Sequence, residues 1–517
     1  MKKTWSPLLA ALLVLAILAP MSAVAEAVTF PVENIEFTYW YPMWEDETRF
    51  VGNGDMGDLN MYQQLEKDTG VKINWIHPPV AENRTAFNVM LASKDLPDII
   101  TQEYYVDYPG GPDKAIADGV YLRLNELMEQ YAPDYWGLIN EDAEIRSQTR
   151  TDSGNVWCFN MIDSFAQPSY YGPVYRKDWL DALELAVPTT LDEYHDMLVA
   201  FRDKMGADVP LYMSYEGFFR NSKMLMSAFD VSHEFFVREG VIHYGPVEDG
   251  FRDYLALMKQ WMDEGLIDAE FATRTQGGSY EAYVTNNRTG AWEDAHFTWQ
   301  GLLAKATDPN MKLASGPYLK MTPDQTIHFR QQNYRAQQNA TAITTACEHP
   351  EIAAAWLNMK FTDQYRIWGN YGVEGLTYEL VDGKPQFTEF AYKNPDGLSL
   401  NQVLYKYCFG KGPYYRIMGR NWFTFLPEGV ASMTTWFESS DGAAMLSPYM
   451  SMSPEDGEEY AIIMSDIETY MKESAVAFIT GANSLDNWGD YVKTIESMGL
   501  ERALAIKQAS YDGFLKR

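Results

Sequence analysis

The sequence predicts an α/β protein with at least two lobes, on the basis of its length and its alternation of strand and helix patterns. The chain has 517 residues, well above the ~250 to 300 at which one hydrophobic core stops growing. Between residues 35 and 100, short runs rich in β-branched and aromatic residues alternate with runs of helical periodicity, and a second such unit starts near Tyr170. This alternation is typical of a largely parallel sheet covered by helices.

The first unit has the order strand, helix, strand, helix, strand. Ligands of open α/β sheets bind beyond the carboxyl ends of the strands. Those ends here carry WYPMW from Trp40 and EYY from Glu103. The expected elements are IEFTYW from Ile35, Met61 to Lys67, VKINWIHP from Val71, Ala81 to Ser93, and DLPDII running into a strand.

The second unit and the C-terminal region contain well-marked helices. After a strand and a short helix from Tyr170, Thr190 and Glu193 form a capping box ahead of a longer helix. Pro350 stands at a permitted first-turn position of another helix. Two further helices are expected, from Ser453 to Gly481 and from Ser484 to Gly499.

Residues 1–27 predict an export signal. Lys2 and Lys3 precede an apolar run from Leu8 to Leu18, followed by Pro20 and small residues that fit cleavage near Ala25 or Ala27. The run is shorter than the ~20 residues that a membrane-spanning helix needs. No cysteine lies near the cleavage region, so we expect a periplasmic or extracellular protein that is not lipid-anchored.

The charge and the motifs exclude several classes of function. A formal net charge of −31 argues against nucleic acid as a partner and against an anionic membrane surface. No HExxH, CxxC, GxxxxGK[ST] or GxSxG motif is present, and GNGDMGD lacks the alternating ligands of a calcium loop. We therefore expect no cofactor and no metal. Of the three cysteines, Cys158, Cys347 and Cys408, at least one has no partner in the chain.

The stretch GAWEDAHFTW, from Gly290 to Trp299, raises the possibility of an active site. Two acids about 5 to 9.5 Å apart could form a glycosidase pair. Neighbouring residues of a strand point to opposite faces, however, so Glu293 and Asp294 are poorly placed to act on one bond. Hydrogen bonding is the favoured role for both. Aromatic residues at strand ends and in polar loops also fit a sugar site, because flat rings pack on the C–H faces of sugars.

The chain resembles the family 1 extracellular solute-binding proteins, above all those that bind alginate-type oligosaccharides, over nearly its whole exported length. The motifs that carry the resemblance are, in order, KDLPDII, VYRKDWLDALELAVPTTLDEYHDML, WMDEGLIDAEFAT, NRTGAW, HPEIAAAWLNMKF, YGVEGLTYELVDGKPQFT and FITGANSLDNWGDYVKTIESMGL. The resemblance implies a two-lobed periplasmic-binding-protein fold with a ligand cleft between the lobes. It also implies a receptor without catalytic activity that delivers an oligosaccharide to the membrane permease of an ABC transporter, acting as a monomer.

By similarity, each lobe consists of separated segments. The first lobe would comprise residues 28–164 with a return segment 341–375, and the second lobe residues 165–340 with the C-terminal segment 376–517. Closure of the lobes on a ligand would take place by hinge residues at the crossings between them. Many relatives carry a calcium loop after the helix that here ends in FRDKM, but this chain continues GADVPLYM from Gly206, so no calcium site is expected.

The predicted ligand-binding residues are aromatic, acidic and basic side chains, and the predictions leave two alternatives open. One alternative is an exported glycan-cleaving enzyme, and the other is a binding protein for a peptide or another small polar ligand. The predicted residues are Trp40, Tyr41, Glu103, Tyr104, Trp292, Glu293, Asp294, Trp299, Arg335, Glu374, Arg416 and Trp422.

Overall fold

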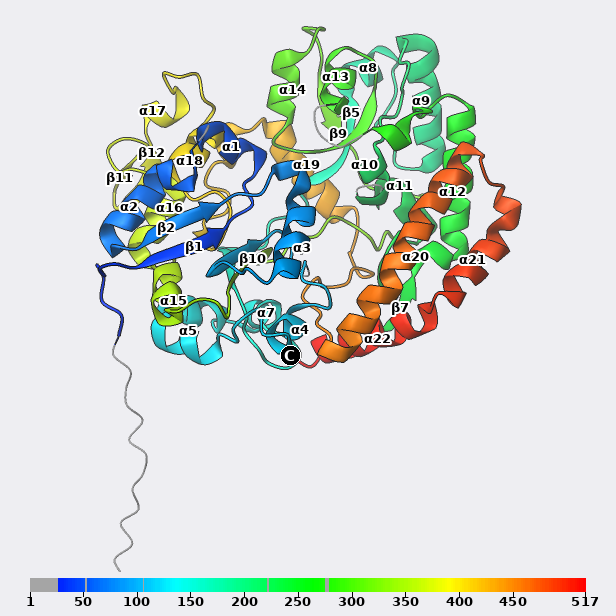
Figure 1. Cartoon of the computed structure of the whole chain (residues 1–517). Coiled ribbons are helices and arrows are strands. Elements are labelled where there is room, and N and C mark those ends of the chain that lie inside the picture. Colours follow the sequence, from blue (N-terminus) through cyan, green and yellow to red (C-terminus); the bar gives the residue numbers. More distant parts are fainter. Residues whose placement is uncertain (1–26, 52–53, 106, 221–222, 275–278) are drawn as a thin grey trace, which may run out of the picture.

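The chain forms two lobes, which stand side by side in Figure 1. The computed structural model describes residues 27–517 except 52–53, 106, 221–222 and 275–278, so all but the last residue of the predicted signal peptide lies outside the described residues. One hydrophobic core contains Tyr39, Trp157 and Trp356, and a separate core contains Trp261 and Trp292. We call the surrounding units the first and second lobes. The two cores predicted from the chain length are confirmed.

The first lobe contains a six-stranded mixed sheet. Strand β1 pairs in parallel with β2 and β3, as the strand and helix alternation predicts. Strand β10 enters between β3 and β4, antiparallel to both, and β13 lies parallel to β4 at the edge. The order across the sheet is β13 (Tyr415–Arg416), β4 (Phe159–Asp163), β10 (Ala336–Ile343), β3 (Ile99–Gln102), β1 (Glu36–Trp40) and β2 (Lys72–Ile76).

Helices and one hairpin surround this sheet. The predicted helices of the first unit are confirmed as α2 and α3, and Pro350 begins α15. The elements are α1 (Glu45–Val51), α2 (Asn60–Thr69), α3 (Asn83–Ser93), α4 (Pro112–Ala117), α5 (Asn125–Tyr131), α6 (Pro133–Ile139), α7 (Ala143–Gln148), α15 (Pro350–Met359), α16 (Asp363–Tyr371), α17 (Glu389–Tyr392), α18 (Leu400–Tyr407), and the hairpin of β11 (Tyr378–Val381) and β12 (Lys384–Phe387).

The return segment of the first lobe is longer than the resemblance implied. All of β10, from Ala336, lies in the first-lobe sheet, ahead of the expected start at residue 341. Strand β13 pairs with β4, so residues up to Arg416 belong with the first lobe, beyond the expected end at residue 375. Backbone pairing sets both limits, and single-strand patterns do not reveal which distant strand is the partner.

The second lobe is mainly helical and contains a small antiparallel sheet. Strand β5 pairs with β8 and β9 on its two sides. The elements are β5 (Tyr171–Arg176), β8 (Ala291–Ala295), β9 (Leu313–Ser315), the hairpin of β6 (Phe235–Arg238) and β7 (Val241–Tyr244), and the helices α8 (Lys177–Ala182), α9 (Leu191–Met205), α10 (Tyr215–Arg220), α11 (Lys223–Met226), α12 (Asp249–Asp263), α13 (Ser279–Thr285), α14 (Trp299–Lys305), α19 (Pro427–Glu438), α20 (Pro454–Thr480), α21 (Trp488–Ser497) and α22 (Leu500–Phe514).

The predicted helix signals of this lobe are confirmed. The Thr190 side chain accepts from the Glu193 backbone N–H, and Glu193 completes the capping box of α9. Ser453 caps α20, which ends at Gly481 in the left-handed conformation. Ser484 caps a short 3₁₀ turn that leads into α21.

Glycine allows one close approach between α19 and the small sheet. A Cβ atom on Gly172 of β5 would lie 2.7 Å from the ring of Trp436. The Trp436 indole N–H donates to the Pro173 carbonyl oxygen at 3.2 Å. Helix α19 is thereby seated directly on β5, the strand that carries Tyr171.

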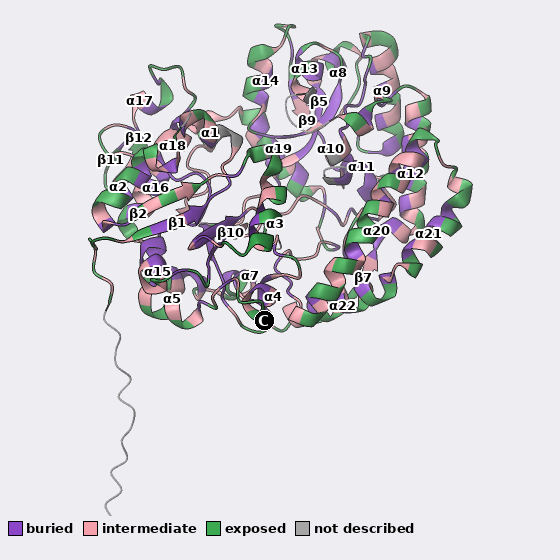
Figure 2. Ribbon diagram, viewed as in Figure 1, coloured by how far each residue is buried: buried purple, intermediate pink, exposed green. Residues whose placement is uncertain are grey.

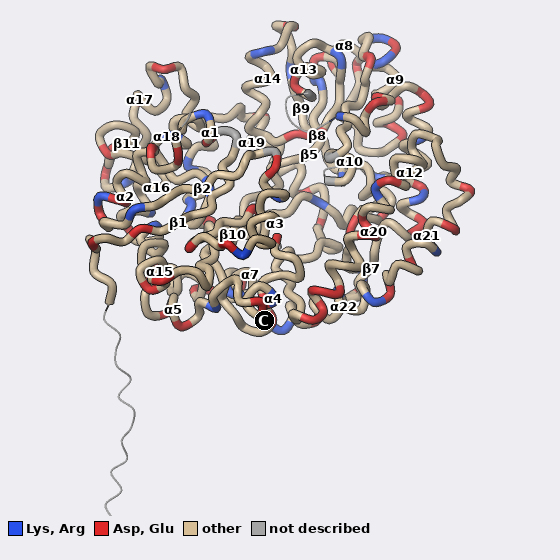
Figure 3. Tube along the Cα trace, in the orientation of Figure 1, with Lys and Arg blue, Asp and Glu red and all other residues tan. Residues whose placement is uncertain are grey.

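The lobes also touch where α20 begins, beside α4 (Figure 1). Arg517 bonds Asp152 of the first lobe at 2.7 Å and Ser451 at 3.0 Å. Exposed and buried residues alternate along the helices of both lobes (Figure 2), and acidic residues are distributed over both lobes (Figure 3). Among the described residues, no helix combines the length and the apolar character needed to cross a bilayer.

Candidate ligand-binding site

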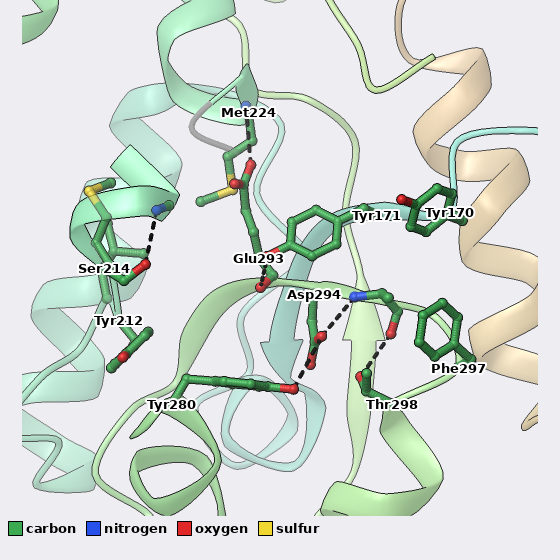
Figure 4. Close-up of a pocket in the computed structure, with 14 residues that line it drawn as sticks. Tyr170, Tyr171, Tyr212, Ser214, Met224, Tyr280, Glu293, Asp294, Phe297 and Thr298 are labelled. Carbon is green, nitrogen blue, oxygen red and sulfur yellow. Dashed lines mark hydrogen bonds between the residues drawn. The ribbon is translucent and has the colours of Figure 1, made fainter. Parts of the chain in front are cut away.

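A cavity of about 300 Å³ lies in the second lobe and contains part of the stretch that suggested a site (Figure 4). This volume is at the lower end of the ~300 to 1,000 Å³ that is usual for small-ligand sites. Five of its lining residues are aromatic and two are carboxylic acids. The lining residues are Tyr170, Tyr171, Leu211, Tyr212, Met213, Ser214, Gly217, Met224, Tyr280, Glu293, Asp294, Ala295, Phe297 and Thr298.

Strand pairing places the walls of this pocket. Tyr171 of β5 pairs with Ala295 of β8, so the start of one strand lies beside the end of the other. The segment before α10 runs beside β8, because the Tyr212 backbone N–H donates to the Ala291 carbonyl oxygen at 2.9 Å. Residues far apart in the chain therefore meet around the last residues of β8.

Asp294 is a buried carboxylate that its neighbours hold in place. It is 4% exposed. It accepts from the Ala295 backbone N–H at 2.7 Å, from Trp292 Nε1 at 3.2 Å and from the Tyr280 hydroxyl at 3.5 Å. Burial raises its pKa to about 6. These contacts orient the Tyr280 ring at the pocket wall.

Glu293 is less restrained. It is half-buried, and the Met224 backbone N–H donates to its Oε1 at the long distance of 3.4 Å. The hydroxyl of Tyr171 donates to the backbone oxygen of Glu293 at 3.0 Å and not to its carboxyl group. Burial raises the pKa of Glu293 well above its usual value. A group in this position can hydrogen-bond a hydroxyl of a ligand.

Aromatic residues continue from the pocket toward the crossing between the lobes. Phe297 is 45% exposed and its ring stacks with that of Tyr170 at 6.3 Å between centroids. Phe425, in the segment that leads from β13 to α19, lies 6.4 Å from Phe297. In the same segment, Trp422 meets the exposed ring of Phe165 edge to face at 5.9 Å. The pocket therefore borders a row of rings on the crossing segments.

The structure places four of the predicted aromatic residues in the cores, which corrects their expected role as stacking faces. Trp40 and Tyr41 are 7% and 0% exposed in the first-lobe core, and Trp292 and Trp299 are each 1% exposed in the second-lobe core. Tyr41 also donates from its hydroxyl to the Lys411 carbonyl oxygen at 2.7 Å. Strand-end rings pack inward here because loops and helices cover the strand ends.

The predicted residues Glu103 and Tyr104 lie at the end of β3 in the first lobe, as expected from the sheet. Glu103 accepts from Asn83 Nδ2 at 2.9 Å and lies 3.4 Å from the Lys411 Nζ atom. Tyr104 is 44% exposed. Neither residue lines the second-lobe pocket.

The predicted basic residues form ion pairs within the first lobe. Arg416 binds Asp163 with two hydrogen bonds, at 2.7 and 2.8 Å. Arg335 Nη1 lies 2.6 Å from Asp142 Oδ2. The predicted acid Glu374 lies in an exposed turn and accepts weakly from the Tyr378 hydroxyl at 3.5 Å. Of all the predicted residues, the structure brings only Glu293 and Asp294 together in the pocket, while Trp422 lies half-buried on the crossing segment, outside the pocket lining.

Sequence reasoning did not assign the tyrosines and small residues of the pocket to the site. Tyr212 and Ser214 precede α10, and Tyr280 lies on the short helix α13, where no local pattern marks them. Phe297 could have been found, since it lies in the GAWEDAHFTW stretch that suggested a site.

Comparison with known proteins supports the resemblance found in the sequence. No protein-family model matches the chain. It is 24% identical over 499 residues to the "Fructooligosaccharide ABC transporter substrate-binding protein FusA" of Streptococcus pneumoniae serotype 4, covering 89% of this chain and 88% of that protein. It is also 24% identical to the "Polygalacturonan/rhamnogalacturonan-binding protein YtcQ" of Bacillus subtilis over 337 residues, or 62% and 64% of the two chains.

The fold is similar to that of a solved structure over most of its length. The alginate-binding protein AlgQ2, in a crystal structure without calcium ion, superposes with a TM-score of 0.77 at 22% identity, covering 94% of this chain and all of the other. The resemblance to the family 1 extracellular solute-binding proteins is confirmed, and the fold of this chain is the two-lobed α/β fold of substrate-binding proteins of ABC transporters.

Proposed function

We propose that this protein is an extracytoplasmic receptor that captures an oligosaccharide and delivers it to the permease of an ABC transporter. The observation that carries the proposal is the pocket, in which five aromatic rings surround two carboxylates beside the crossing between the lobes. Rings that pack on sugar C–H faces, with acceptors for hydroxyl groups, form a typical sugar site. FusA, YtcQ and AlgQ2 are named for binding the same broad class of ligand.

The pocket binds one part of the oligosaccharide, and the remainder extends along Phe297, Phe425 and Trp422. A ligand that also touches the first lobe stabilises a closed arrangement, because it gains contacts there that the open arrangement lacks. Glu103 and Tyr104, at the end of β3, are the proposed first-lobe contacts. Their positions at a strand end support this role.

The proposal includes no catalytic step. A glycosidase would need two acids free to act on one bond, but Asp294 already accepts three hydrogen bonds within the protein. Its contacts suit the positioning of Tyr280 rather than proton transfer. Incubation with end-labelled oligosaccharides should therefore yield no new reducing ends.

Titration calorimetry of the mature protein tests the main proposal. A panel of fructo-, gluco-, xylo-, manno- and galacto-oligosaccharides and uronic oligomers should contain ligands that bind with 1:1 stoichiometry, while peptides of similar mass should release no heat. Binding of peptides alone would favour the alternative of a peptide receptor. The protein is also proposed to be monomeric and not lipid-anchored, which light scattering and intact-mass measurement of the exported form would check.

A further inference from the structure

The polar side chains of the pocket carry carboxyl and hydroxyl groups. Glu293 offers a carboxyl group with one long contact, to the Met224 N–H. Asp294 lies beside it, and the Tyr280 hydroxyl uses its proton toward Asp294, so its oxygen is left to accept. The Ser214 hydroxyl oxygen accepts from the Gly217 N–H at 2.9 Å, so its own proton can be donated to a ligand. Sugar hydroxyl groups, which both donate and accept, match such a lining.

The side chains described around the pocket provide no positive charge. Its lining residues include no lysine, arginine or histidine. Lys223, which lies near enough to affect Glu293, forms an ion pair with Glu234 at 3.3 Å. Protonation of Glu293 would add a donor but no positive charge. A carboxylate of a ligand would thus meet two acids without a compensating cation.

The guanidinium groups predicted for the site are also committed to carboxylates of the protein. Arg416 uses both of its bonds to Asp163, and Arg335 pairs with Asp142. A planar guanidinium that binds a carboxylate with two bonds is the usual receptor for an acidic sugar. Here that geometry is already used within the first lobe.

We propose that the second-lobe pocket selects neutral, hydroxyl-rich oligosaccharides and rejects uronic acid residues, with Asp294 as the residue that determines this selectivity. The proposal rests on the proposed function and specifies the substrate class of the same pocket. The names of relatives include both a fructooligosaccharide binder and a polygalacturonan binder, so the fold alone leaves the choice open. A uronic carboxylate is acceptor-only when ionised, and like charges at close range disfavour each other.

Competition measured by native mass spectrometry tests this choice. The mature protein, first freed of bound ligand by unfolding and refolding, is mixed at pH 7.5 with equal concentrations of neutral oligosaccharides and uronic oligomers. The neutral set comprises fructo-, gluco-, xylo-, manno- and galacto-oligosaccharides, and the acidic set comprises galacturonate and alginate fragments. We expect the bound masses to be those of neutral sugars, with at least tenfold preference over any acidic ligand.

The possible outcomes separate this inference from the proposed function. Preferential binding of an acidic oligomer would overturn the inference and leave the oligosaccharide receptor intact. Absence of binding to either set by a folded protein would contradict the proposed function itself, and the inference with it.

Substitution of Asp294 tests the residue. Trimethyl-esterified trigalacturonate and its free acid differ only in charge and methyl groups, so the ratio of their affinities reports charge discrimination. Asp294→Asn keeps the shape of the side chain and should reduce that ratio at least threefold at pH 7.5. Glu379→Gln, which removes an exposed acid on β11 in the other lobe, should leave the ratio unchanged.

The affinities of these two probes decide the role of Asp294. If Asp294→Asn changes the affinities of the ester and the acid by the same factor, or if Glu379→Gln shifts the ratio as strongly, Asp294 does not determine the selectivity. If the wild type binds the acid form as tightly as the ester, the inference fails without any variant.

Discussion

Asp163 in the first lobe and Glu293 in the second lobe are acids with opposite surroundings. In the first lobe, Arg416 and Asp163 satisfy each other with two hydrogen bonds, and Asp163 is fully buried. In the second lobe, Glu293 lines a cavity with a single long hydrogen bond to its carboxyl group. Buried charges that are fully paired contribute to structure, whereas an acceptor left with spare capacity at a cavity can bind a ligand.

Removal of Arg416 should lower the stability of the fold more than any other change considered. A small loss of stability would contradict the structural role of the Arg416–Asp163 pair. Arg416→Ala leaves the buried Asp163 carboxylate without its ionic partner, so the free energy of unfolding should fall by about 3 kcal/mol. Urea unfolding followed by tryptophan fluorescence measures this. Arg123→Ala removes an exposed ion pair with Glu126 and should cost less than ~1 kcal/mol. Equal losses of unfolding free energy in the two variants would show that the buried first-lobe pair contributes no more than an exposed ion pair.

The pH dependence of stability tests the raised pKa of Asp294, the buried acid of the pocket. Burial raises the pKa of Asp294 to about 6, above the ~3.9 of an unfolded chain. The folded state therefore binds this proton more tightly, and the stability that it contributes below pH ~4 is lost as the pH rises to ~6. Between pH 4 and pH 7, Asp294→Asn should gain roughly 2 to 3 kcal/mol relative to the wild type.

Unfolding free energies of both proteins at several pH values check this. Glu293 is present in both proteins, so its own titration largely cancels in the difference. A difference that stays constant across this range would contradict the raised pKa.

Phe297→Ala should affect the ligand rather than the fold. The ring is 45% exposed, so its loss should change stability little. Its stacking on a sugar contributes about 1 kcal/mol, which corresponds to an affinity roughly 3- to 10-fold weaker. Calorimetry with the best neutral ligand measures it. Phe437→Ala, which removes another exposed ring that does not line the pocket, should leave affinity unchanged, and a similar loss there would argue against a specific contact.

Removal of metal ions by a chelator should change the melting temperature very little, the smallest effect of the four. A bound metal would supply the second lobe with the cation that its pocket lacks. The position after α9, where many relatives have a calcium loop, holds Asp208, and this acid forms an ion pair with Arg288 at 2.6 Å. Among the described residues, no group of three or more possible ligands is assembled. EDTA should therefore shift the melting temperature by less than about 1 °C, within the range of surface effects. A drop of several degrees that calcium reverses would show a metal site.

The elements of this fold could be predicted because local signals agree with tertiary packing. The capping box at Thr190 and the alternation from Ile35 to Ile100 require no partner from elsewhere in the chain. The lobe boundaries were less accurate, since β10 and β13 are assigned by pairing with strands more than 170 residues away. Such pairing is decided by the assembled sheet.

The site was predicted only in part, and the alternation of β8 explains one of the errors. Side chains of adjacent strand residues point to opposite faces, and Trp292 and Glu293 leave β8 on opposite sides, although Asp294, near the end of the strand, also lines the pocket. The structure turns Glu293 to the pocket and Trp292 to the core, where its indole N–H donates to Asp294. The arginines failed for another reason: Asp163 and Arg416 are 253 residues apart, and no sequence pattern shows that they pair.

The close packing of α19 against the second lobe determines which backbone residues can rotate on one connection between the lobes. Gly172 leaves no room beside Trp436, and a Cβ on Gly429 of the helix would come within 2.7 Å of the His296 carbonyl oxygen. Helix α19 is therefore clamped to the second lobe, just as Arg416 is clamped to the first. Ile417 and Arg420 also bond Asn370 of the first lobe, so a rotation between the lobes must twist residues 421–426 on this connection. That segment carries Trp422 and Phe425, so the rings beside the pocket would change their angle whenever the lobes turn.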